Sequence, residues 1–408
     1  MANSLLTPTI IAKEALRQLE NNMVMGKLVY RDYESEFGDT KVGQTVQIRR
    51  PVQYSLRSGP TIDLQDTTEG RLNLTVDQQI GVDISFSSVD LTMTIENFSE
   101  RYIKPAMIRI ANRVDTDVHA LYYKVPNWVG TPGQAVDSFS DFSKAPERLD
   151  EISVPTDGRV ATLNPHDYWG LLPELKGLFL NEKAKTALER AKVGLLGNCD
   201  TYMSQNLSTH TTGSHGGTPL IAGASQTSTY ANVKNSMTQT LLIDGATVSI
   251  TGWAKAGDVF TISGVSDVNP VTKALLPITK QFTVMSDANS DSTGAVSLTI
   301  YPAIITSGAY QTADSAPAND VAISFVGSAS TAYRQNLAFN KNAFALCVVP
   351  MELPDAAKIK ARETYKGLSV RLVSDYDINN DRSIWRFDVL YGVEAIDPRQ
   401  ATRLSGTA

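Results

Sequence analysis

The sequence is poor in the residues that carry chemistry. It has two cysteines and four histidines in 408 residues, and no His-x-x-x-His or Cys-x-x-Cys pair of the kind that binds zinc. It also contains neither a Gly-x-Ser-x-Gly nucleophile elbow nor a Walker phosphate loop. We therefore expect no enzyme activity, no catalytic residues, no metal and no cofactor. Cys199 and Cys347 are predicted to be buried free thiols of a cytoplasmic protein.

Long apolar runs and positive net charge are absent as well. No segment approaches the ~18 to 20 apolar residues that span a bilayer, so no membrane partner is expected. The net charge of −6 argues against strong binding to nucleic acid through overall attraction. Arg49 and Arg50 are interpreted as solvated charges, with weak phosphate contact on one face as the alternative. The N-terminus lacks the basic start and cleavage site of a signal peptide, which predicts cytoplasmic synthesis.

The C-terminal half contains a block that is nearly free of charge. There is no glutamate between Glu189 and Glu352, and no arginine between Arg190 and Arg334. Residues 221–330 hold 11 charges in 110 positions. Five or more short alternating segments in this block are separated by Gly, Asn, Asp and Ser. Such a pattern predicts a small antiparallel barrel or sandwich, inserted into a host domain of ordinary charge.

Two stretches at the edges of this block are predicted to be irregular. The sequence TTGSHGGTP, residues 211–219, is interpreted as a linker that contains His215 and follows His210. Residues 302–320 form a loop long and polar enough to protrude.

The N-terminal third changes its period twice. Pro8 begins one short amphipathic helix, and alternation from Gly38 onwards predicts a long β-hairpin over residues 41–87 with a polar tip. A two-stranded ribbon is marginal in water, so the hairpin is expected to rest on another surface. Contact with another subunit is favoured over contact within the chain.

The longest helical pattern covers residues 94–124. Its apolar residues advance by three or four positions and build one stripe, and its length corresponds to a rod of roughly 45 Å. Pro105 is predicted to kink this helix or to split off its first turns. Further helices are expected from Pro165 and over 183–192, and a final hairpin is expected from strands around 368–372 and 385–391.

The order of these elements resembles the major capsid protein fold of tailed bacteriophages, of the Hong Kong 97 type. More narrowly, it resembles the coat-protein family of short-tailed Salmonella phages, whose mixed domain carries an inserted β-barrel. The segments that carry the resemblance are GDTKVGQTVQIRRP, ENFSERYIKPAMIRIANRVDTDVHALYY, WAKAGDVFTISGVSDVNPVTK, KQFTVMSDANSDSTGAVSLTIYPAII and RFDVLYGVEAIDPRQATRL.

The resemblance implies an α+β fold with a particular division of the chain. The expected parts are an N-terminal arm at 1–37, the extended hairpin and flanking strands at 38–90, the spine helix of the peripheral domain at 91–124, the axial domain at 125–217 and 333–366, the inserted β-barrel domain at 218–332, and the C-terminal strands of the peripheral domain at 367–408.

The resemblance also implies a function and partners. The expected protein is a non-catalytic major capsid protein that builds, from pentamers and hexamers of itself, the icosahedral shell around double-stranded phage DNA. Its partners would be a scaffolding protein during assembly, a portal protein and the packaged DNA on the inner face. The resemblance is also compatible with decoration proteins. Assembly in the bacterial cytoplasm and a final location in the virion capsid follow.

Candidate contact residues are assigned on the same grounds. Pro105 is the candidate hinge. The candidate intersubunit contacts of the hairpin are Arg49, Arg50, Tyr54, Arg57, Asp63, Asp66, Glu69 and Arg71. The candidate contacts between capsomers, in loops of the insert, are Asp287, Asp291, Asp314 and Asp320.

Two other readings remain open. One is a bacterial nanocompartment shell protein, which generally lacks such an insert, and the other is an unrelated β-rich binding protein or hydrolase. Some members of the capsid fold also form an isopeptide bond from a hairpin lysine. No lysine occurs here between Lys41 and Lys104, so no such crosslink is expected.

Overall fold

The computed structural model describes residues 8–33, 45–57, 59–62, 64, 68–87, 99–174, 194–355, 357, 359–365 and 368–407. The helix predicted at 183–192 and the candidate residues Asp63 and Asp66 lie outside these ranges. Within them, no helix is both long enough and apolar enough to cross a membrane.

The chain forms two compact units, each made of three segments. Unit 1 contains Met1–Gln47, Asn73–His119 and Phe344–Glu394, and unit 2 contains Ile48–Leu72, Ala120–Ala343 and Ala395–Ala408. This division cuts four of the predicted parts. It separates residues 48–72 from the rest of 38–90 and residues 120–124 from the rest of 91–124. Residues 344–366, predicted in the axial domain, lie in unit 1, and residues 395–408, predicted in the peripheral domain, lie in unit 2.

Unit 1 is an antiparallel sheet with helices. Its strands follow the order β17-β20-β19-β18, and β3 pairs with β20. Helix α1 packs on β18 and β19 through an apolar face that includes Ile11, Leu16 and Leu19. The elements are α1 (Pro8–Asn22), α2 (Met25–Leu28), β3 (Gln78–Ser87), a π-helical turn (Ser99–Ile103), α4 (Lys104–Ala120), β17 (Phe344–Val349), β18 (Ile359–Tyr365), β19 (Leu368–Asp377) and β20 (Arg382–Ala395).

The predicted long helix is confirmed, with a change of helix type at each end. A π-helical turn precedes α4, and a 3-10 helix (Leu121–Lys124) follows it. Pro105 is the second residue of α4, directly after the π-helical turn. Its missing N–H therefore lies where the helix type changes, in line with the predicted alternative that the proline splits off the first turns.

The prediction of one hairpin over residues 41–87 is wrong in its second half. Strand β3 pairs along its length with β20, from Gln78 opposite Tyr391 to Ser87 opposite Arg382. The shorter hairpin consists of β1 (Thr45–Arg49) and β2 (Arg71–Thr75). Alternation identified both strands, but it contains no information about which strand each one pairs with.

Unit 2 contains a six-stranded host sheet with the order β4-β21-β16-β5-β7-β6. Helix α5 contacts β4, β16 and β21 of this sheet. A separate pair joins β8 to β15. The elements are β4 (Asn127–Val129), α5 (Phe139–Glu151), β5 (Arg159–Leu163), α6 (Pro165–Glu174), β6 (Gly194–Leu196), β7 (Cys199–Met203), β8 (Thr209–Thr211), β15 (Ala332–Arg334), β16 (Asn336–Asn340), a 3-10 turn (Lys341–Ala343), another (Pro398–Gln400) and β21 (Ala401–Leu404).

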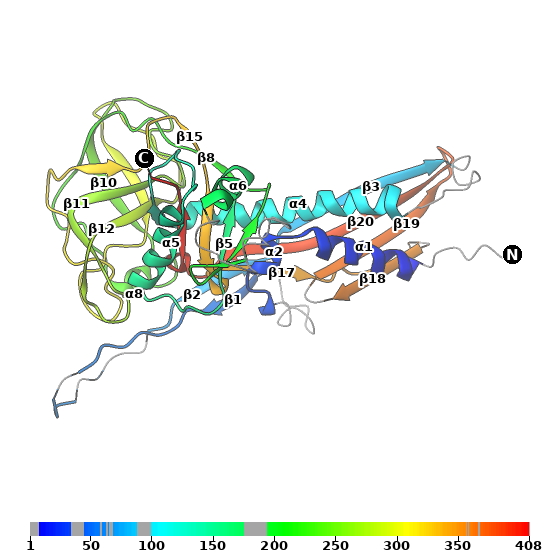
Figure 1. Cartoon of the computed structure of the whole chain (residues 1–408), viewed down its shortest axis with the longest axis horizontal. Helices are drawn as coiled ribbons and strands as arrows, with labels where there is room; N and C mark the ends of the chain where they lie inside the picture. The colour runs from blue at the N-terminus through cyan, green and yellow to red at the C-terminus, as the bar shows by residue number, and fades with distance from the viewer. Residues whose placement is uncertain are drawn as a thin grey trace. The chain divides into compact units, whose positions relative to one another are not determined.

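The charge-poor block forms a six-stranded antiparallel barrel within unit 2 (Figure 1). Its strand order is β14-β11-β12-β13-β10-β9, and the barrel closes where Ile221 N–H donates to Val321 O at 3.0 Å. The elements are β9 (Gly217–Ile221), α8 (Tyr230–Val233), β10 (Gln239–Ala246), β11 (Val259–Val268), β12 (Leu275–Val284), β13 (Val296–Tyr301) and β14 (Ile323–Phe325).

The barrel core explains why the block needs so little charge. It is built from fully buried apolar side chains, among them Trp253, Phe260, Phe282 and Leu298. Burial of each such side chain contributes about 1.5 to 3 kcal/mol, so apolar packing and strand pairing suffice to hold the insert together. The predicted inserted all-β module in an α+β host is confirmed.

Two predictions at the edges of the insert are wrong. The supposed linker contains the end of β8 and the start of β9, because its glycines and threonines conceal a strand pattern. The loop 302–320 does not protrude as predicted. Ala303, Ile305 and Thr312 in it are buried, and the Thr312 hydroxyl lies 3.0 Å from the Ile305 amide that donates to it.

Candidate functional site

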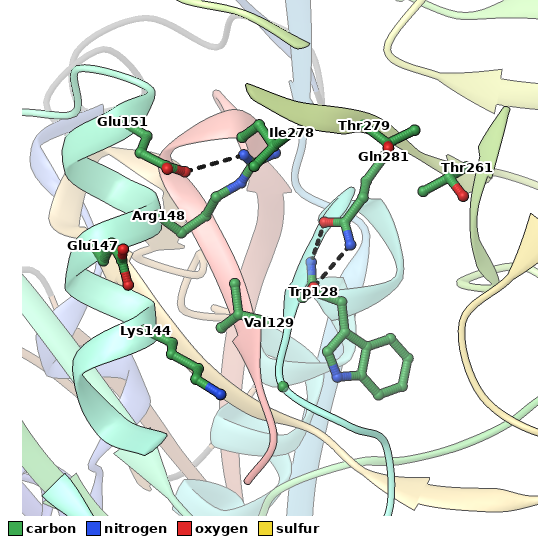
Figure 2. A pocket seen from close by; sticks show the side chains of 11 residues that line it. Trp128, Val129, Lys144, Glu147, Arg148, Glu151, Thr261, Ile278, Thr279 and Gln281 are labelled. Carbon is green, nitrogen blue, oxygen red and sulfur yellow. Dashed lines mark hydrogen bonds and ion pairs between the residues drawn. The ribbon is translucent and has the colours of Figure 1, made fainter. Parts of the chain in front are cut away.

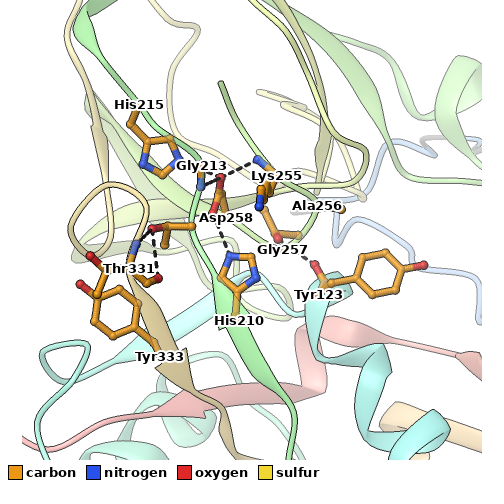
Figure 3. Close-up of polar contacts among 12 residues, drawn as sticks. Tyr123, His210, Gly213, His215, Lys255, Ala256, Gly257, Asp258, Thr331 and Tyr333 are labelled. Carbon is orange, nitrogen blue, oxygen red and sulfur yellow. Dashed lines mark hydrogen bonds and ion pairs between the residues drawn. The ribbon is translucent and has the colours of Figure 1, made fainter. Parts of the chain in front are cut away.

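The buried carboxylate of Asp258 connects three segments of unit 2, which are strand β8, residues 213–215 and residues 255–258 (Figure 3). Asp258 directly precedes β11 and is 1% exposed. The Nε2 atom of His210, on β8, lies 2.8 Å from its Oδ1, and Nε2 of His215 lies 2.7 Å from its Oδ2. The amides of Gly213 and Lys255 also donate to Oδ2, at 3.1 and 2.7 Å.

The electrostatics of this cluster favour an ionised aspartate. Burial alone would raise the pKa of Asp258, but hydrogen bonds from His210 and His215 and the charge on His215 outweigh it and hold the pKa well below its ordinary value. The outer nitrogen of His210 lies 3.2 Å from the Tyr122 hydroxyl, and His215 stacks on Phe325 with ring centroids 3.8 Å apart. The Asp258 cluster therefore holds β8, residues 213–215 and the segment before β11 together by hydrogen bonds.

A buried arginine makes a second connection between the host sheet and the barrel. Arg403, on β21, is fully buried and donates to Gly257 O at 2.6 Å and to the Thr283 hydroxyl at 3.3 Å. Its guanidinium also lies 5.3 Å from the ring centroids of both Tyr122 and Trp128. Burial lowers the pKa of Arg403 to about 10.

A third connection is a buried charge triad between α5 and the barrel. Asp267 of β11 lies 2.8 Å from Arg148 Nη2 and 2.7 Å from Lys280 Nζ. Burial lowers the pKa of Lys280, and the neighbouring Asp267 opposes that shift. Because all three groups are out of water, loss of one would leave an uncompensated charge.

The fourth connection covers the edge strand of the host sheet (Figure 2). Gln281 of β12 accepts a hydrogen bond from Trp128 N–H at 2.8 Å and donates one to Trp128 O at 2.8 Å. Its carboxamide thus makes the two bonds that a neighbouring strand would make to β4. These residues line a groove of about 460 Å³, together with Lys144 and Glu147 of α5.

None of these four connections was predicted from the sequence. A signal was present, because Asp258, Asp267 and Lys280 are among the 11 charges of the block, and each lies in or directly beside a strand. Charges that remain in strands of a charge-poor module are candidates for buried partners. Gln281 and the two histidines carried no comparable signal.

The candidate contact residues of the hairpin differ in exposure and in hydrogen-bond partners. Exposed Arg49 lies 3.5 Å from Glu69, and the half-buried Arg50 donates to Asn235 O of its own chain at 3.3 Å, so Arg50 is not the solvated charge that was predicted. Arg57 bonds to carbonyls of the hairpin itself, those of Gly59 and Thr61. The remaining described candidates, Tyr54 and Arg71, are exposed side chains.

The four candidate acids of the insert are all exposed, and each makes a bond within the barrel. Asp287 accepts from Ala256 N–H at 2.9 Å, and Asp314 accepts from Ser266 N–H at 2.7 Å. Asp291 accepts from the Thr293 hydroxyl and from the amides of Ala295 and Thr293, and these bonds, the one from the hydroxyl foremost, lower its pKa. Asp320 accepts from its neighbour Asn319 at 2.8 Å. Their side chains therefore stabilise turns while remaining accessible.

Known proteins that are similar to this chain include a coat-protein family and a phage capsid protein. The family model described as P22 coat protein, gene protein 5, matches residues 1–406. The chain is 24% identical over 425 residues to a major capsid protein of Acyrthosiphon pisum secondary endosymbiont phage 1, and the match covers 100% of both.

Solved structures give weaker similarity. A Mycobacterium phage Che8 chain is 13% identical with a TM-score of 0.49, and the match covers 93% of this chain and 90% of that one. A chain from the capsid of cyanophage P-SCSP1u is 10% identical with a TM-score of 0.46, covering 93% and 86%. The family match, which spans nearly the whole sequence, is decisive: the chain belongs to the P22 coat protein family and is a phage major capsid protein, a structural component of the virion shell.

Proposed function

We propose that copies of this chain assemble as pentamers and hexamers into an icosahedral shell that encloses double-stranded phage DNA, and that the β1–β2 hairpin binds a neighbouring copy. The observation that carries the proposal is the hairpin tip, which was predicted to be polar but presents four exposed apolar side chains. Tyr54, Leu56, Ile62 and Leu64 are 64%, 99%, 74% and 91% exposed. Large apolar side chains gathered on a thin ribbon are typical of a binding surface.

The energetics suit assembly from many repeated contacts. Burial of one such side chain contributes about 1.5 to 3 kcal/mol. A shell repeats this contact at every subunit, so a modest interface suffices once the shell closes.

The remaining partners follow from the same role. Assembly takes place in the bacterial cytoplasm with a scaffolding protein, for which the exposed Lys13 and Arg17 of α1 are the binding site we propose. A portal protein occupies one opening, and DNA lies against the inner face. A net charge of −6 supports an inner wall that holds DNA without binding it tightly.

We also propose that the chain catalyses no reaction. The support is the family, because its model is described as a coat protein and the matching relative is a major capsid protein.

The test is the double variant Leu56→Ser with Leu64→Ser, produced together with the scaffolding protein. We expect few or no shells by sedimentation and negative-stain microscopy, while the thermal unfolding of the unassembled chain stays unchanged. The control is Val271→Ser, which alters a side chain that is 71% exposed on a barrel turn. Normal shells from the double variant would refute the role of the tip.

A further inference from the structure

The outer part of the hairpin belongs to the same compact unit as the barrel. Residues Ile48–Leu72 group with unit 2, although the segments before and after them, Met1–Gln47 and Asn73–His119, group with unit 1. The chain therefore passes from unit 1 into unit 2 at residue 48 and returns to unit 1 at residue 73. Contacts between hairpin and barrel explain this grouping.

One barrel residue holds both arms of the hairpin. The Asn235 side-chain oxygen accepts from Arg71 N–H at 3.0 Å, and the Asn235 backbone oxygen accepts from the Arg50 guanidinium at 3.3 Å. At the same level, Arg50 N–H donates to Gly70 O at 2.9 Å and joins the two arms. The barrel therefore binds the hairpin at the point where the two arms are hydrogen-bonded to each other.

The fit at this point leaves no space for a side chain. A Cβ at Gly70 would lie 2.1 Å from the backbone oxygen of Lys234. Gly70 is buried, so the hairpin backbone lies directly on the segment that follows α8. Glycine is required by this close approach and not by its own backbone angles.

A second attachment lies one step further along the first arm. The Tyr310 hydroxyl accepts from Gln53 N–H at 3.1 Å, and Lys273 donates to the Gln53 side chain at 3.4 Å. Tyr310 is itself held by Tyr230, whose ring is parallel to it at a centroid distance of 3.4 Å. The stacked pair therefore forms a rigid support under the hairpin.

We propose that the inserted barrel is a platform that sets the direction in which the hairpin leaves its own subunit, before any neighbour binds. Within the barrel, the platform consists of the residues that contact or support the hairpin, which are Tyr230, Lys234, Asn235, Lys273 and Tyr310. A preset hairpin loses less conformational freedom on binding, so the platform strengthens the contact at the tip without touching the neighbour. This inference rests on the proposed function of the tip, but the platform acts in the single chain.

The experiment measures amide hydrogen exchange in the unassembled full-length chain. The variant Asn235→Ala with Tyr310→Phe removes two acceptors and keeps the stacked rings. We expect exchange to become about two- to tenfold faster at each affected amide in residues 48–57 and 68–72, as for the loss of one hydrogen bond. The control is Asn289→Ala, which removes a comparable bond, to Gly252 N–H, at another barrel turn.

A second variant keeps the barrel sequence intact. Gly70→Ala should also accelerate exchange in residues 48–57, because its methyl group displaces the hairpin from Lys234. Unchanged exchange in both variants, with the barrel folded, would overturn the inference and leave the assembly proposal standing. Shells built normally by the tip variants would refute the assembly proposal without affecting the exchange result.

Discussion

Asp115 is a carboxylate placed where ionisation is costly. It is fully buried on α4 and accepts hydrogen bonds from the amides of Val24 at 2.8 Å and Gly26 at 3.0 Å, where α2 begins. Burial raises the pKa of Asp115 from 3.8 to about 6, although these bonds and the charge of Lys27 oppose the shift. The folded state therefore binds this proton more tightly than the unfolded chain does.

The sign of the resulting pH dependence follows directly. Because the folded pKa of Asp115 lies above the unfolded one, the stabilisation is fully present below pH 3.8 and is lost as the pH rises through about 6. Between pH 7.5 and pH 5 the wild-type chain should gain about 1.4 kcal/mol in free energy of unfolding from this group. Asp115→Asn should lack this gain, as measured by urea unfolding at both pH values. A variant with the full wild-type pH dependence would contradict the assignment.

Asp258 should be the most sensitive single position of the barrel base. Asp258→Ala leaves two imidazoles and two amides without their acceptor, and we expect the free energy of unfolding to fall by about 3 kcal/mol or more. The matched change Asp314→Ala removes an exposed carboxylate with one backbone bond from barrel residue Ser266 and should cost less than about 1 kcal/mol. If chemical denaturation gave the same loss in free energy of unfolding for both variants, the buried cluster would contribute no extra stability.

At the scale of elements, Gln281 protects the free edge of β4. Gln281→Ala should expose both backbone groups of Trp128 and accelerate exchange of its amide about two- to tenfold. Gln281→Glu separates the two bonds, since a carboxylate can accept from Trp128 N–H but cannot donate to Trp128 O. We expect the Trp128 amide to stay protected in the Glu variant. Protection in the Ala variant as well would show that another group covers this edge.

Periodicity predicted most elements but not their partners. The stripe on α4, the alternation of the barrel strands and the final hairpin are local patterns, and the structure confirms all three. The partner of β3, the strand character of residues 217–221 and the burial of loop 302–320 depend on residues far away in sequence. The pairing of His210 and His215 with Asp258 is likewise not local, because it joins residues 48 and 43 positions apart in sequence.

At the scale of the whole molecule, the position of lysines predicts how shells respond to denaturation. The hairpin body contains no lysine between Lys41 and Lys104, so it has no amine to form an isopeptide bond. Mature shells boiled in detergent should give one monomer band on electrophoresis. A ladder of covalent multimers would refute this prediction, and introducing a lysine at Leu56 would serve as a positive test for a latent acceptor.

The overall role was more predictable than its contacts. An ordered series of elements, from helical arm through hairpin, spine helix and inserted barrel, sufficed for the α+β capsid fold, and the family match confirms that identification. Which candidate residues touch a neighbour depends on surfaces of other copies, about which one chain's sequence carries no pattern.

The alternation of the two units along the chain constrains the order in which a new subunit can fold. The barrel strands all lie within residues 217–325, so their partners leave the ribosome together. The host sheet is different, because Asn127 of β4 pairs with Thr402 of β21. During translation, an early strand must stay unpaired until nearly three hundred further residues have been made. Once the last barrel strand ends at residue 325, a nascent subunit completes its synthesis with a finished barrel and a host sheet that still lacks β21, and in that interval chaperones would be needed most.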